Sequence, residues 1–422
     1  MGSFDCSGSW FGGLPSGWCA IKLKYLASTN NGLTYSPNDV VDSGTPVLRS
    51  NNIRNGKLDK SNLVYVDISV SERSMAHKGD VLICSRNGSK KLIGKNALID
   101  EDGMAFGAFM MIARPHCNSS YFYYILNSQV FDYYLPTYLT STVNQLTTSN
   151  CDNMVVPFTP ERQEQKKIVE FLDSKTAEID VLIDKLRRQV ELMERYRREL
   201  IAHTVTRGLD PDVPMRDSGV DWIGRIPAHW DLEKQKRVLR HVVRTVGSSW
   251  SDFKLLSLGK KGVVERDINS GKGKFPASFE DYQEVIKGDI VMCLFDMDET
   301  PRTVGLSEIP GMITGAYDVF EVAKGDRRYI NYWLHALDNQ KLWRIFYRSL
   351  RKTITAPRFL AIPIALPPEP EQQKISDYLD AAMLDLNSVL TGINRQMELL
   401  GKYRKQVIND AVTGKVLVEG AE

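Results

Sequence analysis

The stretch Pro160–Asp173 reads P-E-R-Q-E-Q-K-K-I-V-E-F-L-D, and the stretch Pro367–Asp380 reads P-P-E-P-E-Q-Q-K-I-S-D-Y-L-D. The second stretch begins 207 residues after the first, and the same offset relates the residues that follow, as far as Thr206 and Thr413. The match runs without a gap over 47 positions, although the sequence between the two copies is unlike either of them. Such an internal repeat indicates one structural unit used twice.

Each copy predicts a long amphipathic helix, at 159–206 and at 367–414. The apolar residues recur at alternating steps of three and four over more than six heptads, which is typical of a coiled coil. At about 1.5 Å per residue, each helix would be roughly 69 Å long. Thr159 is expected to cap the first helix, and Gly208 and Gly414 follow the last turns.

The apolar seam of each predicted helix needs a partner, and the nearest matching seam lies on the other copy. We therefore expect the two helices to pair as an antiparallel coiled coil; the alternative is that each helix packs only on its own domain. The predicted pairing positions of the first helix are Ile168, Leu172, Ile179, Leu182, Leu186, Gln189, Met193, Tyr196 and Leu200. Those of the second helix are Ile375, Leu379, Leu386, Val389, Ile393, Gln396, Leu400, Tyr403 and Val407. A polar residue at equivalent seam positions, as at Gln189 and Gln396, can fix the register.

The remaining sequence divides into two globular stretches, a linker and a tail, at 1–158, 217–366, 207–216 and 415–422. The globular stretches are related, since K-G-D-V-L-I-C at Lys78–Cys84 recurs as K-G-D-I-V-M-C at Lys287–Cys293. The clearest β-type runs are Asn62–Val66, Val81–Cys84, Ala108–Ile112, Ile290–Leu294 and Tyr317–Val322. Aromatic, helical segments follow at 121–131 and 329–337. The predicted fold class is α+β: two similar mixed α/β domains separated by two long, paired helices, with pseudo-two-fold symmetry.

Composition excludes several classes of protein. The chain has 422 residues, 42% hydrophobic and 25% charged, which is typical of a globular protein of about two or three domains. Its six cysteines are scattered without a C-x-x-C pair, which favours a reducing compartment. The sequence begins without a signal-like segment and contains no run of about 18 apolar residues, so we expect a soluble, cytoplasmic protein with no membrane partner.

No motif in the sequence predicts catalysis. The segment G-S-K-K-L-I-G-K-N at Gly88–Asn96 has one residue too many between its glycines to be a phosphate-binding loop. The six histidines are dispersed and predict no metal site. The acidic segment around Asp296, Asp298 and Glu299 could bind a cation, but a single acidic loop is more often solvated surface. We expect neither a metal nor a cofactor on this chain.

Basic residues gather locally, although the net charge is only +2. Six Lys or Arg and no acid lie between residues 339 and 368, and four lie between 81 and 99. Lys and Arg neutralise DNA phosphates, while Arg, Asn and Gln read base edges, so these segments favour duplex DNA over a solvated basic face without a ligand. The candidate contacts of the first domain are Asn51, Asn52, Arg54, Arg86, Asn87, Ser89, Lys90 and Lys91. Those of the second domain are Arg266, Lys272, Lys274, Arg302, Arg351 and Lys352.

The repeated pattern P-x-x-x-E-Q-x-K-I-x-x-[FY]-L-D resembles the helical regions of type I restriction–modification specificity subunits. A-V-T-G at Ala411–Gly414 strengthens the resemblance. The segment G-V-D-W-I-G-R-I-P-A-H-W at Gly219–Trp230 resembles the entry to that family's second target-recognition domain. The resemblance covers essentially the whole chain, although the N-terminal entry segment keeps only Pro15 and Trp18 of its motif, and the first helix ends T-R-G rather than T-G-K.

The resemblance implies a non-catalytic adaptor. Each target-recognition domain would read one half of an asymmetric, bipartite site in double-stranded DNA, and the helix pair would set the length of the unread spacer. The chain would dock two methyltransferase subunits that carry S-adenosylmethionine, and restriction subunits that use ATP and Mg²⁺. Two other classes remain open on the residues alone: a coiled-coil scaffold that ignores DNA, and a standalone DNA-modifying enzyme.

Overall fold

The computed structural model describes residues 10–139, 144–267, 276, 278–347 and 352–416. The chain forms two compact units: unit 1 comprises Met1–Leu186 and Asn394–Glu422, and unit 2 comprises Arg187–Ile393. The division passes through both long helices, α4 (Arg162–Arg207) and α7 (Glu369–Val412). Each unit therefore holds one globular domain together with part of each helix.

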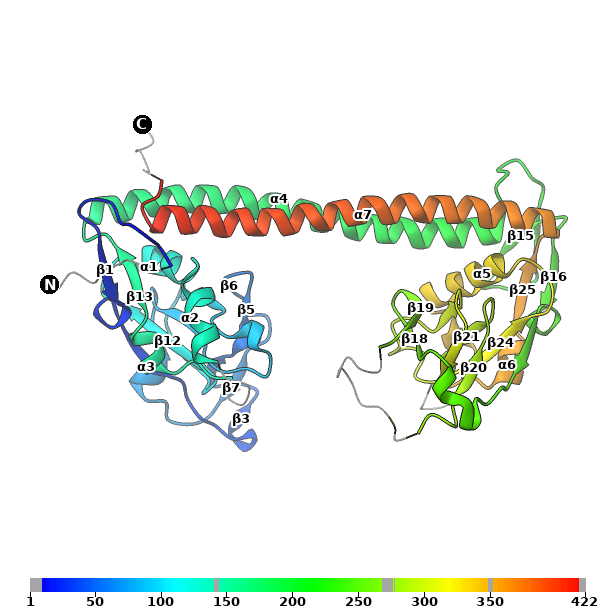
Figure 1. The fold of residues 1–422 in the computed structure, drawn as a ribbon, viewed down its shortest axis with the longest axis horizontal. Coiled ribbons are helices and arrows are strands. Elements are labelled where there is room, and N and C mark those ends of the chain that lie inside the picture. The colour runs from blue at the N-terminus through cyan, green and yellow to red at the C-terminus, as the bar shows by residue number, and fades with distance from the viewer. Residues whose placement is uncertain (1–9, 140–143, 268–275, 277, 348–351, 417–422) are drawn as a thin grey trace. The chain divides into compact units, whose positions relative to one another are not determined.

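The globular part of unit 1 is built on a four-stranded antiparallel sheet in the order β10-β9-β12-β2, with a five-stranded sheet in the order β3-β7-β4-β11-β8 packed against it (Figure 1). The bounds of the four strands are Asn96–Leu98, Val81–Cys84, Met110–Pro115 and Ala27–Asn31. Those of the five are Val40–Val41, Val64–Val66, Thr45–Leu48, Met104–Phe106 and Met75–Ala76. Two further pairs are β1 (Cys19–Lys22) with β13 (Val155–Phe158), and β5 (Ile53–Arg54) with β6 (Lys57–Leu58).

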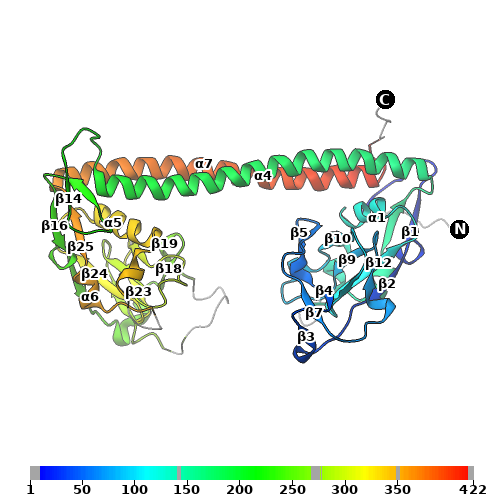
Figure 2. The ribbon, with the colours of Figure 1, turned by 180° about the vertical axis from the view of Figure 1, so that it is seen from behind.

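Unit 2 repeats the four-stranded sheet of unit 1. Its four-stranded sheet has the order β22-β21-β24-β17, which matches the order of the first sheet, whose four strands are labelled in Figure 2. The bounds are Val304–Leu306, Ile290–Met292, Asp318–Val322 and Leu239–Val242. The remaining strands pair as β16 (Asp231–Lys234) with β25 (Pro363–Leu366), β18 (Leu256–Gly259) with β19 (Gly262–Glu265), β20 (Gln283–Val285) with β23 (Gly311–Ile313), and β14 (Met215–Asp217) with β15 (Arg225–Pro227).

Short helices complete each domain. The α-helices are α1 (Ser119–Leu126), α2 (Val130–Tyr138), α3 (Thr148–Asp152), α5 (Arg327–Asn339) and α6 (Ala356–Leu360). The 3-10 helices are η1 (Leu23–Tyr25), η2 (Pro37–Asp39), η3 (Ser50–Asn52), η4 (Glu72–Ser74), η5 (Lys90–Leu92), η6 (Gln235–Arg237), η7 (Gly247–Asp252) and η9 (Leu342–Ile345).

Most of the predicted elements are present with small shifts. The run expected at Ala108–Ile112 begins later, at Met110, because Gly107–Phe109 forms a turn in which Met110 N donates to Gly107 O at 2.8 Å. The aromatic segment expected as one helix is divided into α1 and α2, since Ser128 Oγ donates to Ile125 O at 2.6 Å and ends the first helix. Such side-chain bonds to terminal carbonyls compete with continuation of the helix.

The repeated K-G-D motif forms the turn that enters the central strand of each sheet. In unit 1, Asp80 Oδ2 accepts a hydrogen bond from His77 N at 2.9 Å and pairs with Arg114 at 2.9 Å. In unit 2, Asp289 Oδ2 accepts from Ile286 N at 3.0 Å, and its ion pair at 2.6 Å is with Arg244. Both carboxylates are almost fully buried, so the arginine and the backbone donor satisfy groups that would otherwise be costly to bury.

The repeated tryptophan and glutamate join each domain to its long helix. Trp18 Nε1 donates to Glu164 Oε1 at 3.0 Å in unit 1, and Trp230 Nε1 donates to Glu371 Oε1 at 3.1 Å in unit 2. The glycine that ends the other helix packs at each joint. A Cβ on Gly414 would lie 3.5 Å from Trp18, and one on Gly208 would lie 3.3 Å from Trp230.

In unit 1 the N-terminal part of α4 runs antiparallel to the C-terminal part of α7. Ile168 and Leu172 of α4 share an apolar core with Ile408 and Val412 of α7. Further along α4, Asp180 Oδ1 accepts a hydrogen bond from Arg404 Nε of α7 at 2.9 Å. As the residue numbers increase along α4, those of the contacting residues of α7 decrease, so the two helices are antiparallel in this unit.

Unit 2 shows the same antiparallel relation. Val205 of α4 shares a core with Ile375 and Leu379 of α7, and Arg197 Nη2 donates to Asn387 Oδ1 at 2.5 Å. In both units, then, the helices pair with each other as well as with a domain, and the predicted fold class is confirmed: related mixed α/β units with paired long helices.

One part of the predicted seam is wrong. Six of its positions are exposed: Leu182, Gln189, Tyr196, Val389, Gln396 and Tyr403. The following residue is buried or half-buried instead in every case: Ile183, Val190, Arg197, Leu390, Met397 and Arg404. The other predicted positions are buried or half-buried as expected, at Ile168, Leu172, Ile179, Leu186, Met193, Leu200, Ile375, Leu379, Leu386, Ile393, Leu400 and Val407. The helices turn the i+4 rather than the i+3 position inward, so the two glutamines do not set the register.

The ends of the long helices differ slightly from the prediction. Helix α4 begins at Arg162, and Thr159 Oγ1 accepts from Glu161 N at 3.3 Å just before it. Gly208 and Gly414 follow the last turns with φ values of 76° and 69°, the left-handed conformation that favours glycine. Among the described residues, no helix is both long enough and apolar enough to cross a lipid bilayer.

Candidate nucleic-acid interface

The candidate residues of unit 1 leave the end of β9, where a turn fixes the backbone. Ser85 N and Arg86 N both donate to Phe109 O, at 3.0 and 3.1 Å, and Leu146 N donates to Ser85 O at 2.7 Å. The loop that follows contains η5 and carries the basic side chains. Backbone hydrogen bonds to two neighbouring loops therefore fix the position at which this loop begins.

Two hydrogen bonds bring this loop next to the loop that carries Asn51. Asn87 Nδ2 donates to Ser50 Oγ at 3.4 Å, and Lys95 Nζ donates to Ser50 O at 3.2 Å. The two segments chosen from the sequence, 51–54 and 86–91, thus form one surface within unit 1. Asn87 connects them, and its Oδ1 also accepts from Ser89 N at 3.0 Å.

Three cations on this surface remain available to a ligand. Arg86, Lys90 and Lys91 are exposed, and within the described part of the chain no carboxylate pairs with any of them. Asn51 and Ser89 are exposed beside them. An exposed, unpaired group of basic and polar side chains is the arrangement that binds phosphates and base edges.

Asn52 and Arg54 are placed differently. Asn52 is only 1% exposed, and its amide bonds the backbone at Arg49 N, Asp59 O and Asn62 O. Asn52 therefore organises the loop and presents no side-chain surface to DNA, contrary to its place among the predicted contacts. Arg54 is exposed but forms an ion pair with Asp59 at 2.7 Å.

In unit 2, Arg302 is a structural cross-link rather than a free cation. Its Nε donates to Val304 O at 2.9 Å, its Nη1 donates to Lys260 O at 3.1 Å, and its Nη2 contacts His335 Nε2. Burial lowers the pKa of Arg302 to about 10 and that of His335 to about 3, so the neutral imidazole accepts the hydrogen bond. The prediction that Arg302 binds DNA is not supported by this environment.

The acidic segment of unit 2 is neutralised by basic side chains from the 339–368 region. Asp298 accepts hydrogen bonds from Tyr347 at 2.6 Å and Arg344 at 3.0 Å, which lower the pKa of its carboxyl. Lys352 Nζ donates to Glu299 Oε1 at 2.9 Å, and this bond raises the pKa of the lysine. The predicted basic patch and the possible cation site are therefore two sides of one ion-pair network.

The other predicted contacts of unit 2 are described only in part. Arg266 is exposed and follows β19, with its N donating to Leu255 O at 2.8 Å. Lys272, Lys274 and Arg351 lie outside the described residues. In the ranges that the structure describes, no three His, Cys, Asp or Glu side chains gather as metal ligands would, and the five described cysteines are free thiols.

The unit 1 surface is bordered by Phe109 and Arg49, which are not among the contacts predicted from the sequence. Phe109 is 60% exposed and its ring lies under the Arg86 guanidinium, with 5.4 Å from Cζ to the ring centroid. Arg49 lies beside Gly107, at the start of the same turn. The signal that could have revealed Phe109 is a small repeat: G-A-F at Gly107–Phe109 recurs as G-A-Y at Gly315–Tyr317.

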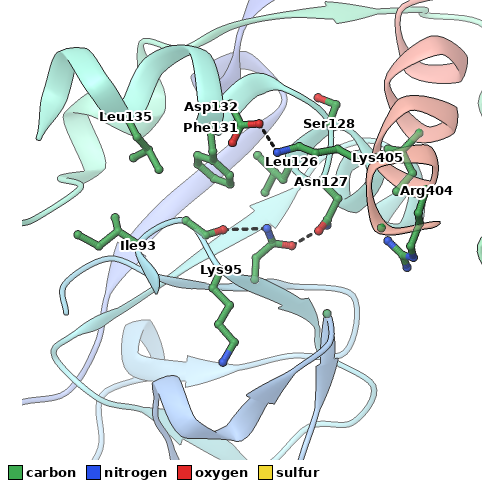
Figure 3. Close-up of a pocket in the computed structure, with 15 residues that line it drawn as sticks. Ile93, Lys95, Leu126, Asn127, Ser128, Phe131, Asp132, Leu135, Arg404 and Lys405 are labelled. Atoms are coloured by element: carbon green, nitrogen blue, oxygen red, sulfur yellow. Dashed lines mark hydrogen bonds and ion pairs between the residues drawn. The ribbon is translucent and has the colours of Figure 1, made fainter. Parts of the chain in front are cut away.

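A pocket of about 310 Å³ lies where α7 meets the domain of unit 1 (Figure 3). Its polar groups are occupied with one another: Asn127 Nδ2 donates to Asn96 Oδ1 at 2.7 Å, and Lys405 pairs with Asp132. No histidine or cysteine lines it, and its one carboxylate is held by a lysine. The pocket is a packing junction without an acid–base pair.

Comparison with known proteins agrees with this geometry. Residues 15–192 match the family model described as the type I restriction modification DNA specificity domain. The chain is 24% identical over 411 residues to the type I restriction enzyme StySPI specificity subunit of Salmonella potsdam, covering 91% of this chain and 87% of that protein. It is 28% identical over 205 residues to the EcoKI specificity subunit of Escherichia coli (strain K12), covering 46% and 44% of the two chains.

A solved structure from work on complex assembly and conformational transition of the type I R-M system has the same fold. The TM-score is 0.65 at 16% sequence identity, and the match covers 96% of this chain and all of that one. The family model over residues 15–192 and the curated relatives thus show that this chain is similar in sequence to type I restriction–modification specificity subunits, and the solved structure shows the same fold.

Proposed function

We propose that this protein is the sequence-specific DNA-binding subunit of a type I restriction–modification complex. The observation that carries the proposal is the unit 1 surface, where Arg86, Lys90 and Lys91 stand exposed without acidic partners beside Asn51. Lys and Arg in such a position bind phosphates, and the neighbouring Arg and Asn can read base edges in the major groove.

The target is proposed to be bipartite, because one chain contains two related domains with the same sheet order. The residues at the ends of the equivalent strands β9 and β21 differ: unit 1 presents a basic loop and unit 2 presents the Asp296–Glu299 segment. Two domains with the same frame and different loops would read two different half-sites.

Partner subunits are proposed to dock on the exposed side of the helix pair. Three repeat positions keep about half of their apolar side chain exposed in both copies: Leu182, Leu192 and Tyr196, and their equivalents Val389, Leu399 and Tyr403. Exposed apolar groups at matching places in two units fit two copies of one partner, as two methyltransferase subunits would be. These partners would carry S-adenosylmethionine, and restriction subunits in the same cytoplasmic complex would use ATP and Mg²⁺.

The DNA-binding surface is tested by replacing Arg86 and Lys90 together with Ala. Each phosphate contact contributes about 0.9 to the salt dependence, so the slope of log affinity against log salt is expected to fall by about 1 if Lys90 alone contacts a phosphate and by about 2 if Arg86 does as well. At least a tenfold loss of affinity is expected near physiological salt. The measurement is duplex binding by the full chain with its methyltransferase partners, at several salt concentrations.

The matched control is Lys22→Ala with Lys24→Ala, which removes the same charge from β1 and η1, at the other side of the domain from β5 (Figure 1). The control is expected to bind like the wild type. Equal salt slopes for both double variants and the wild type would show that this loop does not contact DNA. A wild-type complex that binds no duplex would support the alternative of a coiled-coil scaffold without DNA binding.

A further inference from the structure

The Arg86 guanidinium lies over the face of Phe109, and both side chains are exposed. In the residues that the structure covers, the guanidinium donates to no carboxylate or carbonyl oxygen. A guanidinium held over the face of an aromatic ring by cation–π attraction has lost part of its rotational freedom. The Arg86 guanidinium is therefore held in place while its N–H groups remain available to a ligand.

The aromatic support is itself rigid. Phe109 leaves a turn in which Gly107 N donates to Leu48 O at 2.9 Å, and Phe109 O accepts from both Ser85 N and Arg86 N. The backbone at Gly32 approaches so closely that a Cβ there would lie 2.1 Å from Gly107 O. These bonds and close contacts fix the place of the Phe109 ring beside Arg86.

Unit 2 has an equivalent pair with different chemistry. The Cys84 thiol donates to Arg86 O at 3.7 Å, and the equivalent Cys293 thiol donates to Phe295 O at 3.3 Å, so Phe295 stands where Arg86 stands. The Phe295 ring stacks on Tyr317 with centroids 6.0 Å apart and an interplanar angle of 19°. The layered pair is thus kept in both units, and only in unit 1 does it include a cation.

We propose that Arg86, oriented by Phe109, reads a guanine in the half-site of unit 1, and that the Phe295–Tyr317 pair makes the corresponding contact of unit 2 apolar. A planar guanidinium donates two parallel hydrogen bonds to guanine O6 and N7, whereas an aromatic edge fits the thymine methyl group. The inference rests on the proposed function, and it assigns base reading to Arg86 and leaves phosphate binding to Lys90 and Lys91.

The test compares methylation targets in cells that express the complete complex with the wild-type chain, Arg86→Lys or Phe109→Ala. Arg86→Lys keeps the positive charge and loses the two-pronged donor. The expected result is a relaxed requirement for one G·C pair in one half of the target, by about tenfold or more, with the other half unchanged. Phe109→Ala is expected to relax the same position less.

A gain of function provides the second arm. Phe295→Arg places a guanidinium over Tyr317 and is expected to create a new preference for guanine in the other half of the target. Thermal unfolding of each variant shows whether it folds, and Phe109→Leu serves as a milder substitute if Phe109→Ala does not.

The outcomes separate the assignment of Arg86 from the proposed function of the chain. If Arg86→Lys retains every base of the wild-type target, or relaxes both halves equally, the assignment of Arg86 fails while DNA recognition by the chain stands. If the wild-type chain directs no defined target, the proposed function itself fails.

Discussion

At the scale of single residues, the motif that is repeated in the sequence serves the joints between domain and helix. Gln165 Nε2 donates to Thr159 O at 2.8 Å, and its Oε1 accepts from Asn118 N at 3.3 Å, where Asn118 caps α1. Gln372 makes the same two bonds, to Pro367 O at 2.8 Å and from Asp326 N at 2.9 Å, where Asp326 caps α5.

The second half of the motif acts in the same way. Tyr124 Oη donates to Asp173 Oδ1 at 2.6 Å, and Tyr332 Oη donates to Asp380 Oδ1 at 2.7 Å. Burial and these carboxylates raise the pKa of both phenols, which stay protonated donors. The repeated residues are thus those that attach each domain to its helix, while the residues assigned to DNA differ between the copies.

Gln372→Ala should destabilise unit 2. Gln372 is 2% exposed, and its loss leaves Asp326 N and Pro367 O buried without these partners, which costs about 2–3 kcal/mol in total. The measurement is denaturant unfolding of the full chain. Gln373→Ala is the matched control, since Gln373 is exposed in the same helical turn and its loss should change the unfolding free energy by less than about 0.5 kcal/mol. Equal losses of unfolding free energy for the two substitutions would contradict the role of Gln372 in attaching the domain to α7.

At the scale of elements, α4 and α7 each present two apolar rows, one turned inward and one left exposed. The inward row contains Ile183 and its equivalent Leu390, and the exposed row contains Leu182 and its equivalent Val389. Neighbouring residues on a helix point about 100° apart, so the pairing decides which row is covered. On the proposed function, the exposed row is the side on which a partner subunit would dock.

Substitutions of the neighbouring residues Leu390 and Val389 test which of the two rows is covered. Leu390 is 7% exposed and Val389 is 46% exposed. Leu390→Ala should lower the free energy of unfolding by about 2–3 kcal/mol through lost burial and a cavity, while Val389→Ala should cost less than about 1 kcal/mol. Unfolding of the isolated chain measures both. A larger effect at Val389 would favour the other row as the seam.

At the scale of the whole molecule, one chain holds two domains whose four-stranded sheets have the same strand order, and two continuous helices that each contribute to both units. A paired helix resists changes in length, whereas a flexible linker does not. On the proposed function, helix length is therefore expected to set the number of unread base pairs between the half-sites.

Deleting residues 187–193 together with 391–397 removes one heptad from each helix and preserves the i, i+7 seam on both sides. Seven residues correspond to about 10 Å of helix, so the spacer should shorten by no more than about three base pairs, with the recognised bases unchanged. Methylation-site sequencing with the complete complex gives the spacer directly. Deleting the six residues that follow Val416 is the control for a simple loss of length. An unaltered spacer in the double deletion would refute the idea that the helices measure it.

Much of the fold followed from the sequence because its causes are local or repeated. The run Val81–Cys84 and the glycines after each helix depend on neighbouring residues, and they lie where the sequence predicts them. The gapless repeat predicted the long helices, and the recurring K-G-D segment predicted that the two globular domains are related. In the candidate site, the exposed loop at Arg86–Lys91 was found in the same way, from a local excess of basic residues.

Only the tertiary structure decided which of the candidate residues are free to act. Lys352 is paired with Glu299, 53 positions away, and Arg302 is bonded to His335, 33 positions away. The covered row of the helices, the burial of Asn52 and the exposure of Phe109 likewise depend on segments that are distant in the chain. Periodicity and composition describe a residue and its neighbours along the sequence, whereas charge neutralisation and solvent exposure are set by whatever the fold brings against it.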